Sequence, residues 1–461
     1  MFSFSQTLRI PALLRNTSSL RKDVFRCPRF SLVSERSFVG TYKKESEKEY
    51  TEFKGEQYFK DDYTNVTPTI LGKIGENLHN VPSHPLCLLK ERIHACLEGF
   101  THYDSFSPVV KVRDNFDRLL IEPDHPGRSK SDSFFFNRQH MLRTHTTTHE
   151  LDVYEHRNID KFTITADVYR RDEIDSSHYP VFHQMECVHL LDRSEIAKNA
   201  AHATHHPSKT PAGLVVSDPT SELSKLSESN PIQSEHSIEE VEIVAYQLKA
   251  TLNHILYQLF AESAGSGDST LEIRWIEAFF PFTSPSWEVE IFYQGAWLEV
   301  LGCGILKQKI LDQAGRSNSM GWACGLGLER LAMVLHKIPD IRLFWSKDAR
   351  FLDQFQASDK TLAIFRPFSK FPPCTRDIAF WCSSLEFEAN DLFDLVRDIA
   401  GDFVESVSLI DSFVHPKSGR KSMCYRIVYR SMDRNVTNEE INVLQMQLRE
   451  QVRDRFQVEL R

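Results

Sequence analysis

The chain has 461 residues, of which 41% are hydrophobic, and this is enough for two or three domains with buried cores. Its net charge of −9 excludes a basic coat along the whole chain, so any RNA contact must be local. The nine cysteines form no CxxC pair, so neither a zinc site nor a disulfide framework is indicated, and a reducing compartment is the simpler interpretation.

Residues 1–38 differ in composition from the rest of the chain. Arginine and serine stand among apolar residues, and no acidic residue precedes Asp23. This pattern is typical of a transit segment, whereas Pro11 and Arg15 interrupt the continuous apolar core that a secretory signal needs. A disordered basic arm is the alternative. No later apolar run reaches about 18 residues, so we expect no membrane span.

The next segment, 39–69, is charged and poor in branched apolar residues over 43–63, which predicts a solvated linker or a short helix, with folded sequence beginning near Ile70. A helix is expected over 84–98, closed by Gly99 as a C-terminal cap. A strand-like stretch over 100–110 follows and contains Pro108. Helix, glycine, strand and proline in this order are common in mixed domains.

Two polar stretches follow. The first, 142–150, holds three consecutive threonines, which fit either a strand edge or a set of hydroxyls that bind a ligand. The second runs from Tyr169 to Glu186, and its alternating ends predict two strands joined by a turn around 175–180. On such a hairpin Arg170 and Asp172 share one face, which suits an anion with a planar base. A surface hairpin held by an arginine–aspartate pair is the alternative.

Residues 200–236 are rich in His, Ser, Thr, Pro and Glu, and this composition predicts a disordered or loosely ordered insertion. The following segment, 237–263, has apolar residues at helical spacing and is expected to be a helix packed on a sheet.

Aromatic and glycine-rich stretches come next. Phe280 and Phe282 flank Pro281, a pattern that fits a core corner or an aromatic pocket. Glu299 lies in a strand-like run and is either a salt-bridge partner or a ligand-binding acid. Residues 325–330, Gly-Leu-Gly-Leu-Glu-Arg, lack the Gly-Lys-Ser/Thr of a P-loop, but their glycines would let backbone approach a nucleotide, with a helix beginning at Leu328.

After a linker at 346–364, residues 365–461 predict a separate small domain. Strands are expected at 376–381, 404–413 and 422–429, helices at 390–401 and 438–456, and a short strand at the end, which is a ferredoxin-like order. Several basic residues there would either form a solvated face or contact phosphates: Lys370, Arg376, Lys417, Arg420, Lys421, Arg426 and Arg430.

These stretches together resemble the class II aminoacyl-tRNA synthetases, in the form found in the phenylalanyl enzymes of mitochondria. Pro108 is similar to the proline of motif 1, Tyr-Arg-Arg-Asp with Phe-His-Gln-Met-Glu resembles motif 2, and Gly325 to Arg330 resembles motif 3. The resemblance implies an α+β fold: a class II antiparallel sheet with flanking helices over 70–345, plus a ferredoxin-like anticodon-binding domain over 365–461.

The resemblance also implies a chemistry. ATP would activate phenylalanine as an adenylate with Mg²⁺ present, and the acyl group would pass to mitochondrial tRNA(Phe). Arg170 would neutralise the α-phosphate, Arg330 the γ-phosphate, and Glu299 would be the acid at the metal. The implied contacts of phenylalanine and ATP are His145, Thr147, Thr148, His149, Glu150, Arg170, Asp172, Ser177, His178, Tyr179, Gln184, Met185, Glu186, Phe280, Phe282, Glu299, Ala323, Cys324 and Arg330. Thr147 stands where the family commonly has serine, and Cys324 where it usually has an aromatic residue.

A matrix location and a monomer are implied as well, because the catalytic and RNA-binding modules share one chain. A noncatalytic synthetase-like protein is one alternative, but Arg170 and Arg330 are both present. A ligase that passes an adenylate to a non-tRNA acceptor is another, and the C-terminal domain argues against it.

Overall fold

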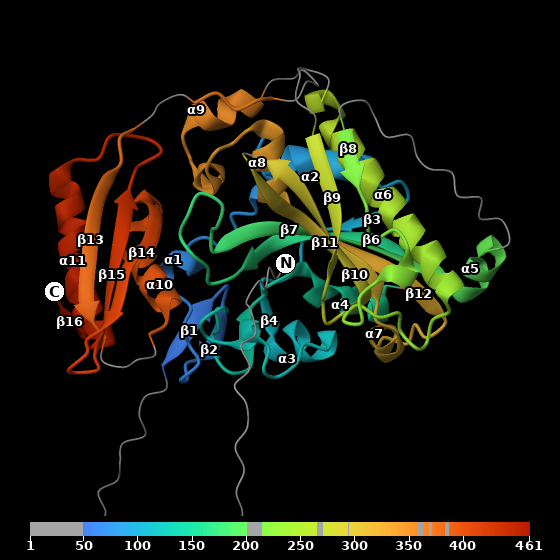
Figure 1. Ribbon diagram of the computed structural model, residues 1–461, viewed down its shortest axis with the longest axis horizontal. Coiled ribbons are helices and arrows are strands. Elements are labelled where there is room, and N and C mark those ends of the chain that lie inside the picture. Colours follow the sequence, from blue (N-terminus) through green and yellow to red (C-terminus); the bar gives the residue numbers. More distant parts are fainter. Residues whose placement is uncertain are drawn as a thin grey trace, which may run out of the picture.

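The computed structural model describes residues 49–157, 159–200, 214–264, 271–293, 295–356, 363–367, 371–382 and 387–461 (Figure 1). The expected transit segment and most of the 200–213 stretch lie outside these ranges, so the structure does not test them. No helix in the described ranges combines the length and the apolar content that crossing a bilayer requires.

An eight-stranded sheet organises the larger part of the described chain. Neighbouring strands are antiparallel except at the two edges, where β3 is parallel to β6 and β8 is parallel to β9. In spatial order the strands are β3 (Thr101–Tyr103), β6 (Lys161–Tyr169), β7 (Val181–Asp192), β12 (Ser319–Gly327), β11 (Ala296–Leu306), β10 (Thr283–Tyr293), β9 (Leu271–Ala278) and β8 (Leu214–Ser217). The parallel edges make this sheet mixed, whereas the sequence predicted an antiparallel one.

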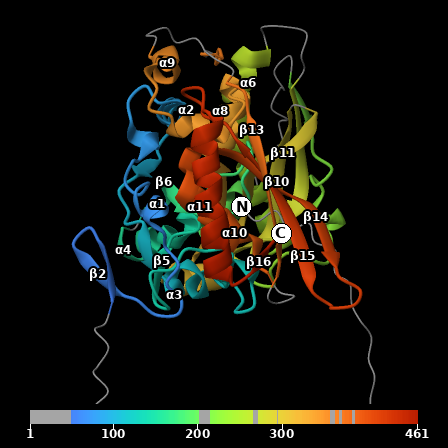
Figure 2. The same cartoon turned by 90° about the vertical axis from the view of Figure 1, so that its left-hand side faces the viewer.

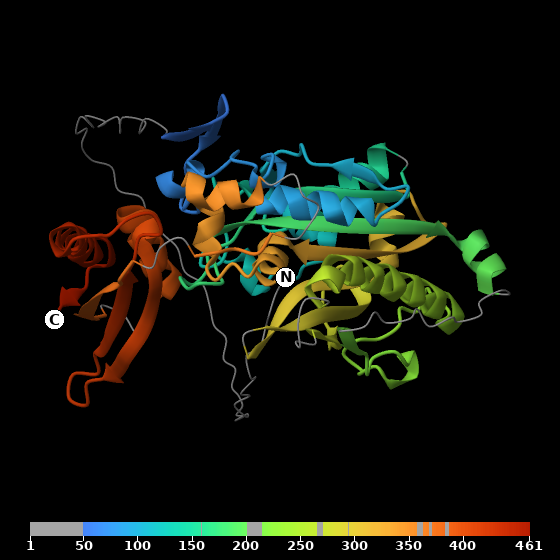
Figure 3. The same cartoon turned by 90° about the horizontal axis from the view of Figure 1, so that it is seen from above.

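One face of the sheet is covered by α2 (Pro85–Ala95), α6 (Ile238–Ala264) and α8 (Leu328–His336), which contact one another (Figure 3). The apolar residues of α6, among them Leu248, Leu252 and Ile255, recur at helical spacing and are buried in the main core. The helix expected over 84–98 ends earlier, at Ala95. Gly99, with φ of +78°, lies in the turn that follows rather than capping the helix.

The opposite face carries the short elements that frame the site, and they enclose a second cluster of buried side chains that includes Phe116, Phe162 and Leu311. These elements are α3 (Val112–Asn115), β4 (Val109–Lys111), β5 (His140–Leu142), the 3₁₀ turn η4 (Thr146–His149), α4 (Glu150–His156) and α7 (Gln308–Gln313). Since strand side chains alternate, the two faces of β7 and β12 belong to different environments.

The expected linker over 39–69 is wrong for its second half. There β1 (Tyr50–Phe53) and β2 (Glu56–Phe59) form a hairpin, and α1 (Pro68–Leu71) follows. Lys54 and Gly55 both have positive φ, as a tight hairpin turn requires. Tyr58 anchors the hairpin on Phe136, with the ring centroids 4.6 Å apart. A few aromatic contacts therefore order a segment whose average composition is charged.

Two further segments are more ordered than expected. Within 200–236, β8 joins the sheet, and Asn230 donates to the Ser286 carbonyl over 2.9 Å, so side-chain bonds to strand backbone hold a polar stretch in place. Within 346–364, α9 (Ala349–Leu352) and the turn at Asp353–Phe355 bury Phe351 and Phe355 in the main core.

The C-terminal domain has the expected ferredoxin-like fold. Its antiparallel sheet has the order β14 (Val404–Val414), β15 (Lys421–Tyr429), β13 (Cys374–Trp381), β16 (Glu459–Leu460), and α10 (Ala389–Ala400) and α11 (Asn438–Phe456) pack with it (Figure 2). Helix α11 begins with a capping box of Thr437 and Glu440, which satisfies two backbone donors at its start.

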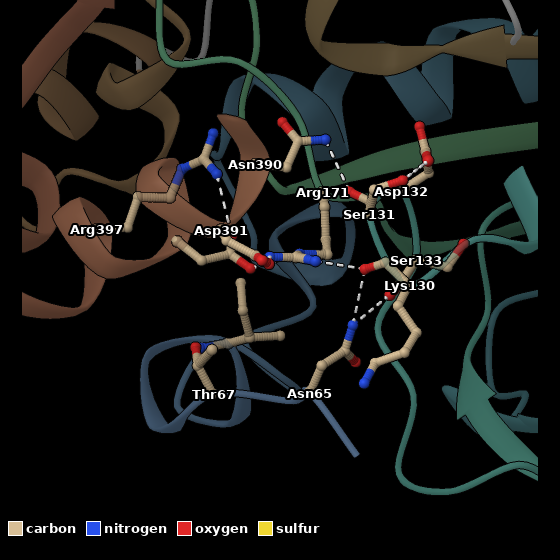
Figure 4. Close-up of polar contacts among 12 residues, drawn as sticks. Asn65, Thr67, Lys130, Ser131, Asp132, Ser133, Arg171, Asn390, Asp391 and Arg397 are labelled. Carbon is tan, nitrogen blue, oxygen red and sulfur yellow. Dashed lines mark hydrogen bonds and ion pairs between the residues drawn. The ribbon is translucent and has the colours of Figure 1, made fainter. Parts of the chain in front are cut away.

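The loop between β6 and β7 joins the two domains. Arg171 Nε donates to Asp394 over 2.6 Å and its Nη2 to Asp391 over 2.7 Å, while Asn390 donates to the Ser131 carbonyl over 2.7 Å (Figure 4). Ile174 of the same loop is buried in the core of the C-terminal domain. The loop that the sequence predicted to bind an anion is therefore also the docking surface for α10.

Candidate active site

Two adjoining cavities open on the sheet face opposite to α2, α6 and α8. The larger, here called the charged cleft, encloses about 1230 Å³ including its mouth, and its charged lining includes Arg170, Asp172, Glu299 and Arg330. The smaller, here called the aromatic pocket, encloses about 390 Å³ and is lined by Phe280, Phe282, Ala323 and strand backbone. Arg170 and Gln184 line both cavities, so they mark the place where ligands in the two would meet.

Arg170 follows the last residue of β6 and is fixed from both sides. Its backbone N–H donates to the Pro180 carbonyl over 3.0 Å, its Nε donates to the Thr144 carbonyl over 2.9 Å, and its guanidinium lies 5.1 Å from the centre of the Phe182 ring. Burial lowers its pKa to about 10, with Asp172 and Glu299 opposing that change, so the side chain stays cationic at neutral pH. A buried cation held in this way is suited to stabilising developing negative charge.

A turn brings a second basic group to the cleft. Asp175 accepts hydrogen bonds from the backbone of Ser177 over 2.7 Å and of His178 over 2.9 Å, and its Oδ2 lies 2.8 Å from His178 Nδ1. That bond raises the pKa of His178, which favours a protonated ring facing an anion. Tyr179 also lines the cleft. Its ring stacks on Trp345 and its hydroxyl donates to Asp402 over 2.6 Å, so these contacts are structural.

Arg330 stands in the first turn of α8 at the far side of the cleft. Its Nη1 donates to the Glu299 carbonyl over 3.2 Å and lies 3.6 Å from Glu299 Oε2. That oxygen has no hydrogen-bond partner among the described residues, although it is buried. Burial, followed by the charge of Glu299, raises the pKa of the nearby Glu288 to about 7.

The carboxylates at the cleft fit a magnesium ion that is bound together with substrate phosphates. No group of three or more His, Cys, Asp or Glu side chains in the described ranges is arranged to hold a metal ion by itself. Mg²⁺ is commonly bound through one or two carboxylates together with substrate phosphates and water. Glu299 Oε2, which borders the charged cleft and accepts no hydrogen bond from the described residues, could serve as such a carboxylate oxygen.

The aromatic pocket is flat and apolar. The rings of Phe280 and Phe282 are stacked with centroids 6.0 Å apart, and strand glycines leave its floor without side chains. At neighbouring Gly304 an added Cβ would lie 2.6 Å from Thr283 and 2.7 Å from the Pro285 carbonyl oxygen, so close strand packing there requires glycine. Such a pocket accepts an unsubstituted aromatic ring.

The polar end of this pocket is built by β7 and η4. Gln184 Oε1 accepts from the Thr146 backbone over 3.2 Å, and Glu186 Oε2 accepts the hydroxyls of Thr146 over 3.1 Å and Thr147 over 3.0 Å. His145 lines the pocket as well, and burial, followed by the charge of Arg170, lowers the pKa of its ring. A carboxylate and hydroxyls next to an apolar pocket suit the ammonium group of an amino acid.

Several residues expected as substrate contacts lie elsewhere. Met185 and Cys324 point to the helix-covered face and are buried in the main core, because they alternate with Glu186 and Ala323 along their strands. The absence of an aromatic residue at position 324 therefore changes the core and leaves the pocket lining intact. His149 stacks on Phe106 outside both cavities, and Thr148 and Glu150 lie behind their lining.

Glu329 also lines the charged cleft, and no role was predicted for it from the sequence. It is buried, and its carboxylate accepts the backbone N–H of His183 over 2.8 Å and contacts the His183 ring nitrogen over 2.7 Å. The pair ties β7 to the start of α8 and so sets the distance between Arg170 and Arg330. The sequence feature that could have identified Glu329 is its position as an acidic residue in the first turn of a helix, where it complements the helix dipole.

Comparison with known proteins gives consistent matches over both domains. The family model "tRNA synthetases class II core domain (F)" matches residues 70–204 and 231–355, and the model "Ferredoxin-fold anticodon binding domain" matches residues 369–461. A Mus musculus protein named "Phenylalanine--tRNA ligase, mitochondrial" is 45% identical over 401 residues, covering 85% of this chain and 84% of the mouse protein. A Saccharomyces cerevisiae protein of the same name is 42% identical over 451 residues, covering 89% and 95%.

Proposed function

We propose that this chain, which belongs to the class II aminoacyl-tRNA synthetase family, is a phenylalanine–tRNA ligase that acts in mitochondria. The observation that supports this most strongly is the junction of the two cavities at Arg170 and Gln184. An aromatic amino acid in the pocket would present its carboxylate there, and ATP in the cleft would present its α-phosphate to the same guanidinium.

The proposed reaction has two steps. The phenylalanine carboxylate attacks the α-phosphorus of ATP and pyrophosphate leaves, and then a terminal ribose hydroxyl of tRNA takes the acyl group. Arg170 would neutralise charge that builds at the α-phosphate, and Arg330 would hold the γ-phosphate. Mg²⁺, held by Glu299 and the phosphates, would supply further charge neutralisation. The residues act by positioning and electrostatics, because no protein nucleophile is needed.

Phenylalanine specificity would rest on the aromatic pocket. Wild-type protein is expected to support ATP–pyrophosphate exchange with phenylalanine and poorly with tyrosine, because the pocket would bury the phenol hydroxyl without a partner. Ala323→Gly removes a methyl group from the lining and is expected to raise the tyrosine-to-phenylalanine ratio of kcat/KM about tenfold or more. The matched control is Cys324→Ala, one residue along on the opposite face, which should leave the ratio unchanged. An Ala323→Gly ratio equal to wild type would contradict the assigned pocket.

The open face of the C-terminal sheet is proposed to contact the anticodon of tRNA(Phe). Trp381 and Phe413 meet edge to face there, and the guanidinium groups of Arg420 and Arg461 each lie 5.3 Å from the Trp381 ring centre. The basic residues expected from sequence have protein partners as well: Arg376 donates to Asn438 and Asn442, Arg420 pairs with Glu459, Arg426 pairs with Asp377, and Arg430 pairs with Glu405. Lys370 lies outside the described residues. Aromatic rings with flanking cations suit single-stranded bases, so this cluster is the stronger candidate.

Trp381→Ala is expected to lower kcat/KM for tRNA charging roughly tenfold, because each base stacked on an aromatic ring is typically worth about 1–3 kcal/mol. Pyrophosphate exchange without tRNA should stay at the wild-type rate. Met446→Ala serves as control, since Met446 is exposed on α11 of the same domain. Equal charging by the Trp381 and Met446 variants would reject this RNA contact.

A matrix location and a monomeric state complete the proposal. Composition of residues 1–38 supports import, and the presence of catalytic and RNA-binding modules on one chain supports a monomer. Fractionated mitochondria and light scattering test these two points, and a stable dimer at micromolar concentration would contradict the second.

A further inference from the structure

A second carboxyl group lies behind the polar end of the aromatic pocket. Glu150 is the first residue of α4 and is 1% exposed. Its Oε2 accepts the Tyr154 hydroxyl over 2.8 Å, whereas its Oε1 is buried without a hydrogen-bond partner among the described residues. A buried carboxylate oxygen with no donor is costly, so the proton count at this site needs explanation.

The Glu186 carboxylate lies on the same side of η4 and α4 as Glu150, because its Oε2 accepts the hydroxyls of Thr146 and Thr147, which precede Glu150 by one helical turn. Each of the two carboxyl groups acts on the pKa of the other. Glu186 Oε2 already accepts two threonine hydroxyls, and Glu186 lines the pocket while Glu150 does not. Two buried carboxyl groups in contact do not both ionise at neutral pH, because repulsion adds to the loss of hydration. One proton between them would satisfy the orphan oxygen.

The surroundings decide which group keeps the proton. Burial and then Glu186 raise the pKa of Glu150 well above its usual range, while burial raises the pKa of Glu186 to about 7 and the hydroxyls of Thr147 and Thr146 oppose that rise. The other titratable groups near the pair are Tyr154, on which Arg316 also acts, and, across the pocket, Arg170 and the His145 ring. Cys324 lies on the opposite face of the sheet, in the main core. The negative charge therefore belongs on Glu186, which has more donors and faces the ligand.

We propose that Glu150 is a positioning residue that stays protonated and donates a hydrogen bond to Glu186, so that one negative charge, held in a fixed orientation, faces the substrate ammonium. This rests on the proposed function, because it assumes that the aromatic pocket binds an amino acid. A single carboxylate matches a single ammonium group, and the neutral partner adds a hydrogen bond without adding repulsion.

The arrangement gives amino-acid binding a defined pH dependence. Ionised Glu186 binds the ammonium group and protonated Glu186 does not, so KM for phenylalanine falls as pH rises through about 7. Removing the donor at position 150 raises the pKa of Glu186, because the charged form loses a hydrogen bond. The fall in KM for phenylalanine then occurs at higher pH. The KM for ATP is expected to stay constant, because the pair does not line the charged cleft.

Two variants test the protonation state. Glu150→Leu supplies no donor, and it is expected to raise KM for phenylalanine about tenfold at pH 7. The pH at which KM begins to fall should rise by about one unit, because a tenfold effect corresponds to one pKa unit. Glu150→Gln keeps the shape, accepts from Tyr154 and donates to Glu186, so it is expected to restore KM and the pH profile. If Glu150 worked as an ionised second counter-ion, Glu150→Gln would lose binding as Glu150→Leu does, and that result would overturn the proposal.

The measurements are KM values from pyrophosphate exchange between pH 6 and 9, and calorimetric binding of phenylalaninol, which has the ammonium group and lacks the carboxylate. Glu155→Gln is the matched control, since Glu155 is an exposed carboxylate on the same helix that pairs with Arg118. An unchanged profile in Glu150→Leu would also contradict the proposal. Failure of the wild-type protein to activate phenylalanine at all would instead reject the proposed function.

Discussion

Replacing Arg170 with alanine is expected to lower the rate of ATP–pyrophosphate exchange about 10³-fold, because removal of one donor aimed at developing charge in a dry site typically costs 10²–10³ in rate. Arg170 lines both cavities and remains cationic despite its burial. Binding of phenylalanine in the aromatic pocket should weaken much less, because the rings of Phe280 and Phe282 provide most of that contact.

The experiment compares single-turnover adenylate formation by Arg170→Ala with that by Arg157→Ala. Arg157 is exposed and lies over the Tyr103 ring, away from both cavities, so its loss should leave the rate unchanged. Circular dichroism establishes that both variants are folded. A folded Arg170→Ala variant that exchanges pyrophosphate within a few-fold of wild type would exclude the assigned role.

The adjacent arginine is expected to give the opposite result. Arg171→Ala should lower the free energy of unfolding by roughly 3 kcal/mol, because breaking a buried ion pair leaves an uncompensated charge. Its partner Asp394 is 2% exposed and would keep Arg397 as its one remaining counter-ion among the described residues. The variant should still form adenylate at a rate far above that of Arg170→Ala. Arg171 borders the charged cleft, but its guanidinium is bonded to Asp391, Asp394 and the Lys130 carbonyl (Figure 4).

Asp391→Ala provides the comparison for Arg171→Ala. It removes the other ion-pair partner, whose side chain is 45% exposed, and it should cost less than about 1 kcal/mol because solvent screens that pair. Urea denaturation followed by circular dichroism measures both variants. Equal denaturation midpoints for Arg171→Ala and the wild-type protein would show that the contact between the loop and α10 contributes no stability.

Local patterns predicted the elements well where one physical signal dominated. The glycine-rich stretch predicted a helix that begins at Leu328, which is the first residue of α8. The helix predicted over 438–456 matches α11, since its cap at Thr437 is local. The fold class follows from the same kind of information, because strand and helix periods are encoded in short stretches.

Contacts between distant residues could not be predicted in this way. The partners of Arg171 lie more than 200 residues away, at Asp391 and Asp394, and no periodicity identifies them. The prediction of a separate C-terminal domain did not include Ile174, which is buried in the core of that domain. The resemblance placed whole motifs in the site, whereas strand alternation turns Met185 and Cys324 toward the helices. The Glu150–Glu186 pair likewise depends on how α4 packs against β7.

Charging of tRNA tests the central claim most directly. Purified full-length protein is incubated with ATP, Mg²⁺ and labelled phenylalanine or tyrosine, together with mitochondrial tRNA(Phe) or a noncognate mitochondrial tRNA. The account predicts phenylalanylation of tRNA(Phe), with little product from tyrosine or from the noncognate tRNA, and loss of the product in Arg170→Ala. Absence of phenylalanylated tRNA(Phe) with folded protein, or equal charging with another amino acid, would contradict it.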